Sequence, residues 1–193
     1  TPPMNQDRKE VLHHARRVVV KVGASVLAPE GKPKAAVFSM LAKQIAGLRG
    51  RNVQGVLVSS GAVASGRPVL GYSNNSISLE DKQAAAAVGQ SLLMEAYRKA
   101  FTRLRGTVAQ VLLTHDDFAN RRRFLNARST LNILLERRIL PIVNENDTVA
   151  TEEISIGDND NLSALVASMI EADVLILLTN TNGLHDQDPN QSK

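Results

Sequence analysis

Short apolar runs alternate with longer amphipathic segments along most of this chain. Five runs are continuously apolar and short enough to be buried strands, at residues 17–22, 55–59, 108–113, 140–143 and 174–178. Apolar residues recur at helical spacing in the four segments 37–50, 79–104, 122–138 and 159–172. Strands that are apolar on both faces and separated by helices are typical of a parallel sheet covered on both sides. The pattern therefore predicts an α/β fold.

Two details of this pattern are specific enough to test. Gly50 follows the first periodic segment and is predicted to end its helix. The third periodic segment is predicted to turn one leucine-rich side toward the core, made of Leu125, Leu131, Leu134 and Leu135.

Polar and glycine-containing clusters follow four of the five predicted strands. They are Lys21–Gly23, Ser60–Gly61, Asn144–Asp147 and Thr179–Asn180. Ligands of parallel sheets bind beyond the carboxyl ends of the strands, so the chemistry is expected along one edge. Each cluster alone has an ordinary explanation, namely a solvated lysine, a helix cap or an Asx turn.

The densest polar stretch is formed by Asn144–Asp147 together with residues 157–161, which read Gly-Asp-Asn-Asp-Asn. Turn chemistry alone does not need so many short amides and carboxylates. Such side chains can hold an ammonium and a carboxylate at once, and a lysine such as Lys21 suits a phosphate oxygen. The stretch therefore favours a site for a small zwitterion beside phosphates.

Composition narrows the function classes further. The 193 residues are 43% hydrophobic and 22% charged with a net charge of +4, which is typical of a globular enzyme. Without cysteine there is no disulfide or thiolate metal site, and no apolar run approaches the roughly 18 residues of a membrane span. Residues 1–15 read as a flexible leader without a signal-peptide core, so a cytoplasmic location is expected.

Two local motifs suggest other classes of function. The arginines at 121–123 could form a nucleic-acid patch, but four Phe and two Tyr offer little stacking surface, so a solvated helix face is favoured. His115 is followed by two aspartates only as a local run, and no Ser-His-Asp triad or metal-ligand cluster is evident. Neither common glycine-rich nucleotide loop occurs in the sequence.

Taken together, six motifs resemble the glutamate 5-kinases of the amino-acid kinase family. They are Lys21-Val-Gly-Ala-Ser25, Val58-Ser-Ser-Gly61-Ala-Val-Ala, Gln110-Val-Leu-Leu-Thr114, Phe124-Leu-Asn-Ala-Arg128, Pro141-Ile-Val-Asn-Glu-Asn-Asp147 and Gly157-Asp-Asn-Asp-Asn-Leu-Ser163. The resemblance covers about residues 16–189. Acetylglutamate, aspartate and uridylate kinases share the fold but lack the last two motifs as a pair.

The resemblance implies an αβα sandwich with a mainly parallel sheet, and phosphorylation of the γ-carboxylate of L-glutamate by ATP and Mg²⁺ as the first step of proline biosynthesis. It implies proline as a possible inhibitor and a homo-oligomer, with no nucleic-acid or membrane partner. The implied roles fall on Lys21 for the transferred phosphoryl group, Asp160 for positioning lysines, Ser60, Gly61, Asn144, Asp147 and Asn159 for glutamate, and Gly23, Thr179 and Asn180 for the nucleotide.

The sequence also departs from the family pattern. Ala24 stands where the family has Thr or Ser, Asn180 replaces an aspartate, and His185 replaces an aromatic residue. The family's glycine-rich segment with a second lysine would lie beyond Lys193, so residues 16–193 are expected to form the amino-acid half of the domain and to turn over little ATP alone. The alternative is a non-catalytic sensor that binds glutamate or proline.

Overall fold

The computed structural model describes residues 4–28, 33–72, 77–149 and 159–179. In chain order the elements are α1 (Met4–His14), β1 (Arg17–Val22), α2 (Ala24–Leu27), α3 (Ala35–Gly50), β2 (Gln54–Ser59), α4 (Ala62–Gly66), α5 (Leu79–Thr102), β3 (Val108–Leu113), α6 (His115–Ala119), α7 (Arg121–Glu136), β4 (Leu140–Glu145), α8 (Asn159–Met169) and β5 (Val174–Leu178).

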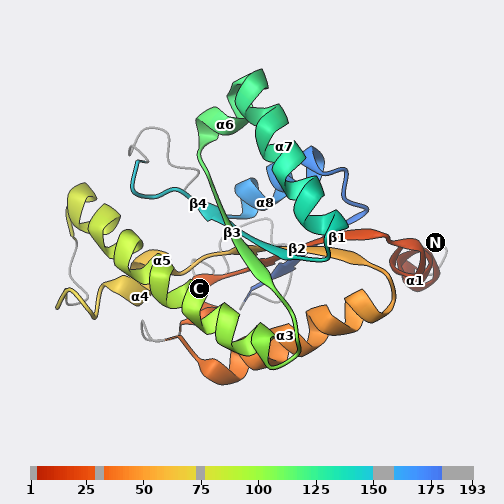
Figure 1. The fold of residues 1–193 in the computed structure, drawn as a ribbon, viewed down its shortest axis with the longest axis horizontal. Helices are drawn as coiled ribbons and strands as arrows, with labels where there is room; N and C mark the ends of the chain where they lie inside the picture. Colours follow the sequence, from red (N-terminus) through yellow and green to blue (C-terminus); the bar gives the residue numbers. More distant parts are fainter. Residues whose placement is uncertain (1–3, 29–32, 73–76, 150–158, 180–193) are drawn as a thin grey trace, which may run out of the picture.

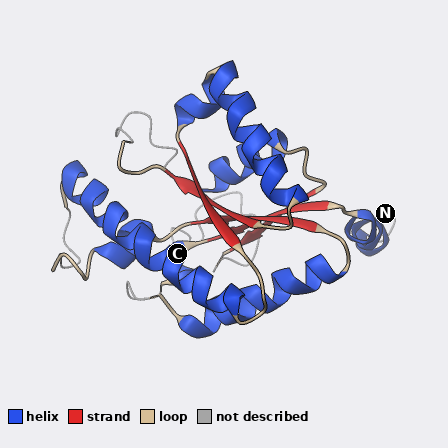
Figure 2. Cartoon of the chain, viewed as in Figure 1, coloured by secondary structure: helices blue, strands red, loops and turns tan. Residues whose placement is uncertain are grey.

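The five strands form one parallel sheet in the order β3-β4-β2-β1-β5, which confirms the predicted α/β architecture (Figure 2). The register aligns Lys21 with Val58 on one side and Leu177 on the other. The carboxyl ends of β1, β2 and β5 therefore lie together at one edge of the sheet.

Helices cover both faces of the sheet, with α3 and α5 below it and α7 and α8 above it in Figure 1. The even-numbered residues of β1, such as Val18 and Val20, pack with Phe38 of α3 and Tyr97 of α5. The neighbouring odd-numbered residue Val19 belongs to the opposite core, with the buried residues of α7 and α8. This alternation is the two-residue period of a strand that is buried on both faces.

The observed helices and strands differ from the predicted ones in several places. β4 continues through Asn144 and Glu145, which the sequence placed after the strand. Residues 4–14, expected to belong to a flexible leader, form α1, and Ala15 beyond it is buried. The short helices α2 and α6 had no periodic signal, because four or five residues are too few to show one.

The predicted inner face of α7 is wrong at one position. Leu131 and Leu135 are fully packed against the sheet, but Leu125 is 48% exposed. Leu125 is six residues before Leu131, which is close to 600° around a helix, so the two side chains cannot share one face.

The four helices that lead into β2, β3, β4 and β5 end in the same way. Each has a left-handed residue that is not glycine after its last turn: Asn52, Arg105, Arg138 and Glu171, with φ between 53° and 64°. The amide of the following residue then donates to a carbonyl five residues back, as Val53 does to Leu48 and Ile139 to Leu134. Gly50 is the last residue of α3, which confirms the predicted helix end, but the left-handed position lies two residues later, at Asn52.

Candidate active site

The cation of the site comes from the end of β1. Lys21 is only 7% exposed, and its Nζ lies 2.5 Å from Oδ1 of Asp160 in the first turn of α8. Burial of an unpaired ammonium would be costly, and the Asp160 carboxylate offsets that cost by forming an ion pair with it. The structure thus brings together the two residues expected to act on the phosphoryl group.

Two backbone turns sit beside this ion pair. Gly23 donates its amide to the carbonyl of Leu178, and Ser60 donates its amide to the carbonyl of Val22. Gly61 then has φ of 101° and precedes α4, so a side chain there would be strained. These bonds tie the carboxyl ends of β5, β1 and β2 into one surface of exposed backbone.

A chain of amide side chains runs across the same edge. Nδ2 of Asn159 donates to Oγ of Ser60 at 2.8 Å, to Oδ1 of Asn144 at 3.0 Å and to the carbonyl of Ser59 at 3.1 Å. Nδ2 of Asn144 donates to Oε1 of Gln90 at 2.9 Å. Asn159, Asn144 and Ser60, expected from separate motifs, therefore form one network across α8, β4 and β2.

Gln90 extends this network to the edge strand. Its Nε2 donates to Oε1 of Gln110 on β3 at 3.1 Å. The backbone amide of Glu145 also donates to Oδ1 of Asn144, at 2.9 Å. Asn144 is thus held from both ends of its side chain, and the amide orientation is fixed rather than free to rotate.

Tyr97 supports the network from the core. Its ring is fully buried, and its hydroxyl donates to Oγ of Ser59 at 3.0 Å. Burial raises the pKa of the Tyr97 phenol, so it stays a donor across the ordinary pH range. Ser59 lies one residue before Ser60, and the bond therefore holds the end of β2.

A glycine contact between α4 and α5 holds the Ser60–Gly61 turn from behind. A Cβ on Gly66 would lie 1.8 Å from the carbonyl oxygen of Ala85, and one on Gly89 would lie 1.8 Å from that of Ala62. The helices can approach this closely only because neither position has a side chain. Since α4 begins directly after Gly61, this packing sets where the turn lies.

Asp147 lies just beyond β4, close to the carboxylate of Glu145, and its side chain is partly buried. Burial raises the pKa of its carboxyl group to about 6, and the nearby charge of Glu145 adds to the shift. The ionised form is therefore stabilised when a cation arrives, such as an ammonium group. This environment fits the expected contact between Asp147 and a substrate ammonium.

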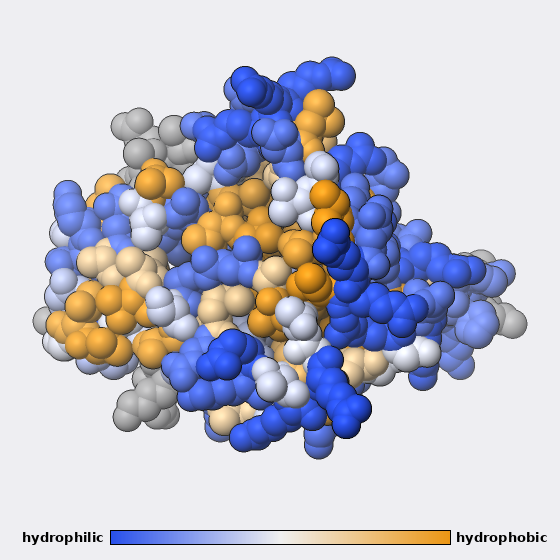
Figure 3. Space-filling model, viewed as in Figure 1, coloured by the Kyte–Doolittle hydropathy of each residue, from blue (hydrophilic) through white to orange (hydrophobic). Residues whose placement is uncertain are grey.

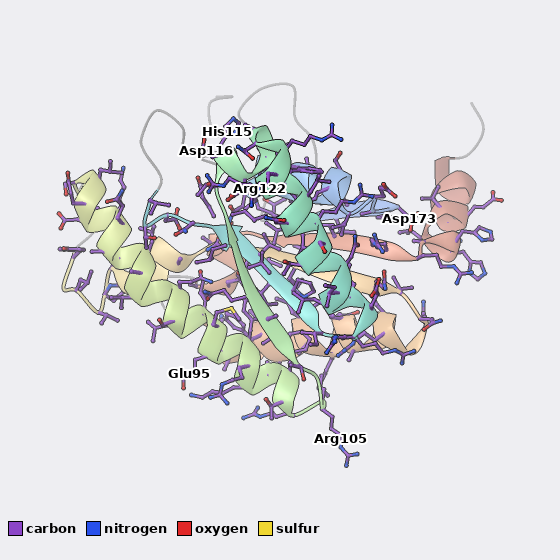
Figure 4. All side chains as sticks on the ribbon, turned by 45° about the horizontal axis from the view of Figure 1, so that its top comes forward. Glu95, Arg105, His115, Asp116, Arg122 and Asp173 are labelled. Carbon is purple, nitrogen blue, oxygen red and sulfur yellow. The ribbon has the colours of Figure 1, made fainter. Side chains whose placement is uncertain are left out.

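The remaining predicted residues are only partly described. Thr179 follows β5 at the same edge and is exposed, while Asn180 and the segment 157–158 lie outside the described residues. His115 and Asp116 lie at the top of Figure 4, on α6 near Arg122. Their neighbour Asp117 accepts from both the amide and the hydroxyl of Thr114, so this run begins a helix.

Sequence reasoning missed Gln90, Tyr97 and Gly89, which all come from α5. Glutamine, tyrosine and glycine are all residue types that occur in ordinary amphipathic helices, so none of the three stands out in the sequence of α5. The only available signal was small residues facing each other, in Gly61–Gly66 and in the alanine-rich start of α5. The hydrogen bonds of Tyr97 and Gln90 join residues 38 and 54 positions apart, which local patterns do not carry.

Within the described residues, no group of three or more histidines and carboxylates is placed to hold a metal ion. No described helix has the length and apolar character needed to cross a bilayer.

With this edge described, comparison with known proteins defines the class. The amino acid kinase family model matches residues 16–193. The chain belongs to the amino acid kinase family.

The curated relatives of the chain carry the name of one enzyme within this family. The chain is 53% identical over 183 residues to a protein of Geobacter sp. (strain M21) named glutamate 5-kinase, which covers 94% of the chain and 49% of the relative. Identity is 47% over 186 residues to the glutamate 5-kinase of Teredinibacter turnerae, covering 96% and 50%, and 51% over 182 residues to that of Chromohalobacter salexigens, covering 94% and 48%. The chain spans about half the length of these relatives, and the resemblance seen in the motifs is confirmed.

Proposed function

We propose that this chain forms the amino-acid-binding part of a glutamate 5-kinase, which transfers a phosphoryl group from ATP to the γ-carboxylate of L-glutamate. The observation that carries the proposal is the joining of Lys21, Asp160, Asn159, Ser60 and Asn144 at one edge of the sheet. The relatives' names supply the substrate and the reaction. The product would enter proline biosynthesis.

On the glutamate side, recognition rests on charge and amide groups. The ionised carboxylate of Asp147 accepts from the substrate ammonium, while Ser60, Gly61 and the Asn144–Asn159 pair orient the rest of the molecule. Because Nδ2 of Asn159 is shared among three protein acceptors, its contribution to the substrate falls mainly to its carbonyl oxygen. The γ-carboxylate is then left unpaired with Asp147 and can attack.

On the phosphate side, the problem is repulsion between two anions. The attacking oxygen of glutamate forms a bond to the γ-phosphorus while the bond to the leaving oxygen of ADP breaks. An ammonium has three donors, so Lys21 can contact the transferred group while paired with Asp160. Alignment and this fixed positive charge are the main contributions that phosphoryl transfer requires of a protein.

ATP, when bound with Mg²⁺ on its phosphates, supplies the phosphoryl group. Several features of this edge fit phosphates: the Lys21 cation, the backbone at Gly23 and the end of β5 at Thr179, with Asn180 as a further proposed contact. A Cβ at Gly23 would lie 3.6 Å from the carbonyl oxygen of Leu178, which is an ordinary van der Waals contact. Mg²⁺ is proposed as part of the nucleotide complex.

Further parts of the proposal concern partners and location. A cytoplasmic enzyme with proline as a possible feedback inhibitor, and without nucleic-acid or membrane partners, is proposed on the resemblance to this family. A homo-oligomer is also proposed. In support, Figure 3 has an apolar area in the middle of the view, where β3 runs between α5 and α7 in Figure 1, and β3 pairs on one side only among the described residues.

The test is a hybrid enzyme in which residues 16–193 replace the matching segment of the Geobacter relative. We expect glutamate-dependent release of ADP, and trapping with hydroxylamine should yield the γ-hydroxamate that an acyl phosphate forms. A hybrid that binds glutamate yet forms no hydroxamate would favour the sensor alternative, which Asn180 motivates. A hybrid that folds but binds no glutamate would contradict both.

A further inference from the structure

A cavity of about 410 Å³ lies at the amino edge of the sheet, opposite the candidate active site. Its lining includes the residue before β1, the turn between α3 and β2, and the turn between α7 and β4, represented by Arg16, Asn52 and Leu140. This volume lies within the range of small-molecule pockets and suits a ligand up to nucleotide size. Nothing in the proposed kinase reaction uses this region.

Three arginines line this cavity from three different segments: Arg16, Arg49 and Arg138. One carboxylate, Glu136, also lines it, so the cavity has an excess of positive charge. Among the described residues, none of the three guanidinium groups forms an ion pair. Clefts that concentrate one sign of charge attract ligands of the opposite sign.

The arginines are held by ordered backbone. Arg138 and Asn52 are two of the left-handed residues that end α7 and α3, and Nη2 of Arg138 donates to Oδ1 of Asn52 at 3.3 Å. The guanidinium of Arg49 reaches the α5–β3 turn, where a Cβ on Gly106 would lie 3.3 Å from its Nη1. The cavity is therefore built from well-defined turns rather than from long side chains alone.

Arg17, the residue after Arg16, does not line the cavity, and its guanidinium is bonded to other parts of the protein. Its Nε donates to Oε1 of Gln54 at 3.0 Å, and its Nη1 donates to the carbonyl of Ile170. Asp173 takes the backbone amides of Arg16 and Arg17, and so does not pair with the Arg16 guanidinium. Helix C-termini favour cations, which accounts for arginine at this edge but not for three arginines lining one cavity.

We propose that this arginine-lined cavity binds a small phosphate-bearing anion, of a size from pyrophosphate to a mononucleotide. Guanidinium groups match phosphate oxygens with paired hydrogen bonds, and three of them around one volume fit a dianion or polyanion. Nucleic acid fits less well, because the residues that line the cavity include no aromatic side chain for stacking.

The first experiment is isothermal titration of the 193-residue chain with pyrophosphate and, separately, with AMP. We expect saturable binding with a dissociation constant below about 1 mM for at least one probe. Replacing Arg49 and Arg138 by glutamine should weaken it at least tenfold, since each change removes charge-assisted hydrogen bonds to the anion.

Matched controls lie next to the tested residues. Arg51 and Arg137 are exposed neighbours of the same turns and do not line the cavity. The double variant Arg51→Gln, Arg137→Gln loses the same net charge and should bind the probe as the unchanged chain does. Equal weakening in both double variants would show that only general charge is sensed, and would overturn the proposal.

A second comparison separates this cavity from the candidate active site, which could also take a phosphate. Lys21→Gln should leave the cavity's binding unchanged. Loss of binding in Lys21→Gln with no loss in the Arg49, Arg138 variant would place the anion at the carboxyl edge and refute the proposal. So would the absence of binding by either probe up to about 10 mM.

One measurement does not depend on how the variants fold. With isotope-labelled arginine side chains in the unchanged sequence, the Nε–H resonances of Arg49 and Arg138 should shift as the probe is added, while those of Arg51 and Arg137 stay in place. Shifts of all four resonances, or of none, would contradict a defined cavity site.

Discussion

The two edges of the sheet are built by different means. At the carboxyl edge, side chains of β1, β2, β4 and α8 hold one another through amide hydrogen bonds and an ion pair. At the amino edge, the order comes from four helix-ending turns with left-handed residues, and three arginines that line a cavity there form no ion pair among the described residues. A parallel sheet separates strand ends from helix ends in this way, because every connecting helix runs back along it.

This difference has a consequence for how each edge responds to change. A site made of mutually bonded polar side chains is cooperative, so losing one partner leaves others buried and unsatisfied. A surface made of backbone turns tolerates side-chain changes, provided the turn conformation is kept. Variants at the carboxyl edge should therefore have larger effects than variants at the amino edge.

The largest expected effect is on turnover, from Lys21→Ala at the carboxyl edge. In the hybrid enzyme, we expect turnover to fall by about two orders of magnitude or more, with little change in the KM for glutamate, because the charge acts on the transferring group. The surface pair Lys99–Glu95 is the matched control, since its atoms lie 2.6 Å apart but both side chains are exposed (Figure 4 labels Glu95). Lys99→Ala should leave turnover unchanged. If Lys99→Ala lowered turnover as much as Lys21→Ala does, the proposed role of Lys21 in phosphoryl transfer would be contradicted.

The next effect is on stability, from Gly89→Ala in the helix contact behind the Ser60–Gly61 turn. The new Cβ would meet the backbone of Ala62, which cannot move without shifting α4, so we expect a loss of about 1–3 kcal/mol in the free energy of unfolding. Gly47 of α3 has open space around it, and Gly47→Ala should instead stabilise by up to ~1 kcal/mol. Chemical denaturation of both variants measures the contrast, which disappears if α4 and α5 can separate at low cost.

A smaller, pH-dependent effect is expected at Asp147. Its carboxyl pKa is raised to about 6, so the protonated form dominates below that pH and cannot attract an ammonium group. Glutamate affinity should therefore fall as the pH drops through 6, and Asp147→Asn should reduce affinity about ten- to a hundredfold at neutral pH. Titration calorimetry from about pH 5 to 8 should show a glutamate affinity that does not change with pH for Asp147→Asn. The same pH dependence in the variant and in the unchanged chain would show that another group ionises near pH 6.

The same shift makes an opposite prediction for stability without ligand. A carboxyl group whose pKa rises on folding costs stability once both states are ionised, so this cost appears as the pH increases from the unfolded value of 3.8 through about 6. Asp147→Asn should hence raise the free energy of unfolding above pH 6 and have little effect near pH 3. Thermal melts across this range measure it, and a stabilisation that is equal at all pH values would exclude the ionisation as its cause.

The smallest expected effect is at the amino edge, from Arg105→Gly. Arg105 is exposed, points away from the body of the chain in Figure 4 and has a φ of 54°. Glycine adopts this conformation without strain, so we expect stabilisation of up to ~1 kcal/mol after the entropy cost of glycine. Arg105→Ala removes the same side chain but keeps the strain, and a midpoint as high as that of Arg105→Gly would show that the arginine, not the backbone, was the cause.

The two edges also differ in how far the sequence could predict them. The five strands and the carboxyl-edge motifs were recognisable, because buried parallel strands are continuously apolar and the polar residues follow them directly. The turns at the amino edge were not, because their left-handed positions are occupied by Asn52, Arg105, Arg138 and Glu171 where a glycine would have marked them. Gly50 marks the end of α3, but it does not mark the left-handed residue two positions later.

Within the site, the sequence indicated which residues matter but not how they are joined. Lys21, Ser60, Asn144 and Asn159 stood out by type and position, yet the link through Gln90 and the support from Tyr97 depend on α5 packing beneath them. The boundary of β4 was two residues short, because Asn144 and Glu145 are polar residues buried in a strand by their partners. Burial of this kind is set by tertiary contacts and leaves no periodic signal.

The position of β1 between β2 and β5 determines when the site can form during synthesis. β1 pairs with β2, which follows it closely, but also with β5, and Arg17 bonds to Asp173 across 156 positions. One edge of β1 therefore stays open until β5 has emerged from the ribosome, and only then can Gly23 meet Leu178. The partner of Lys21, Asp160, also arrives late. A nascent chain should thus add β5 to β1 and bring Asp160 to Lys21 at about the same stage, and pauses in translation before β5 would leave one edge of β1 exposed to association with other chains.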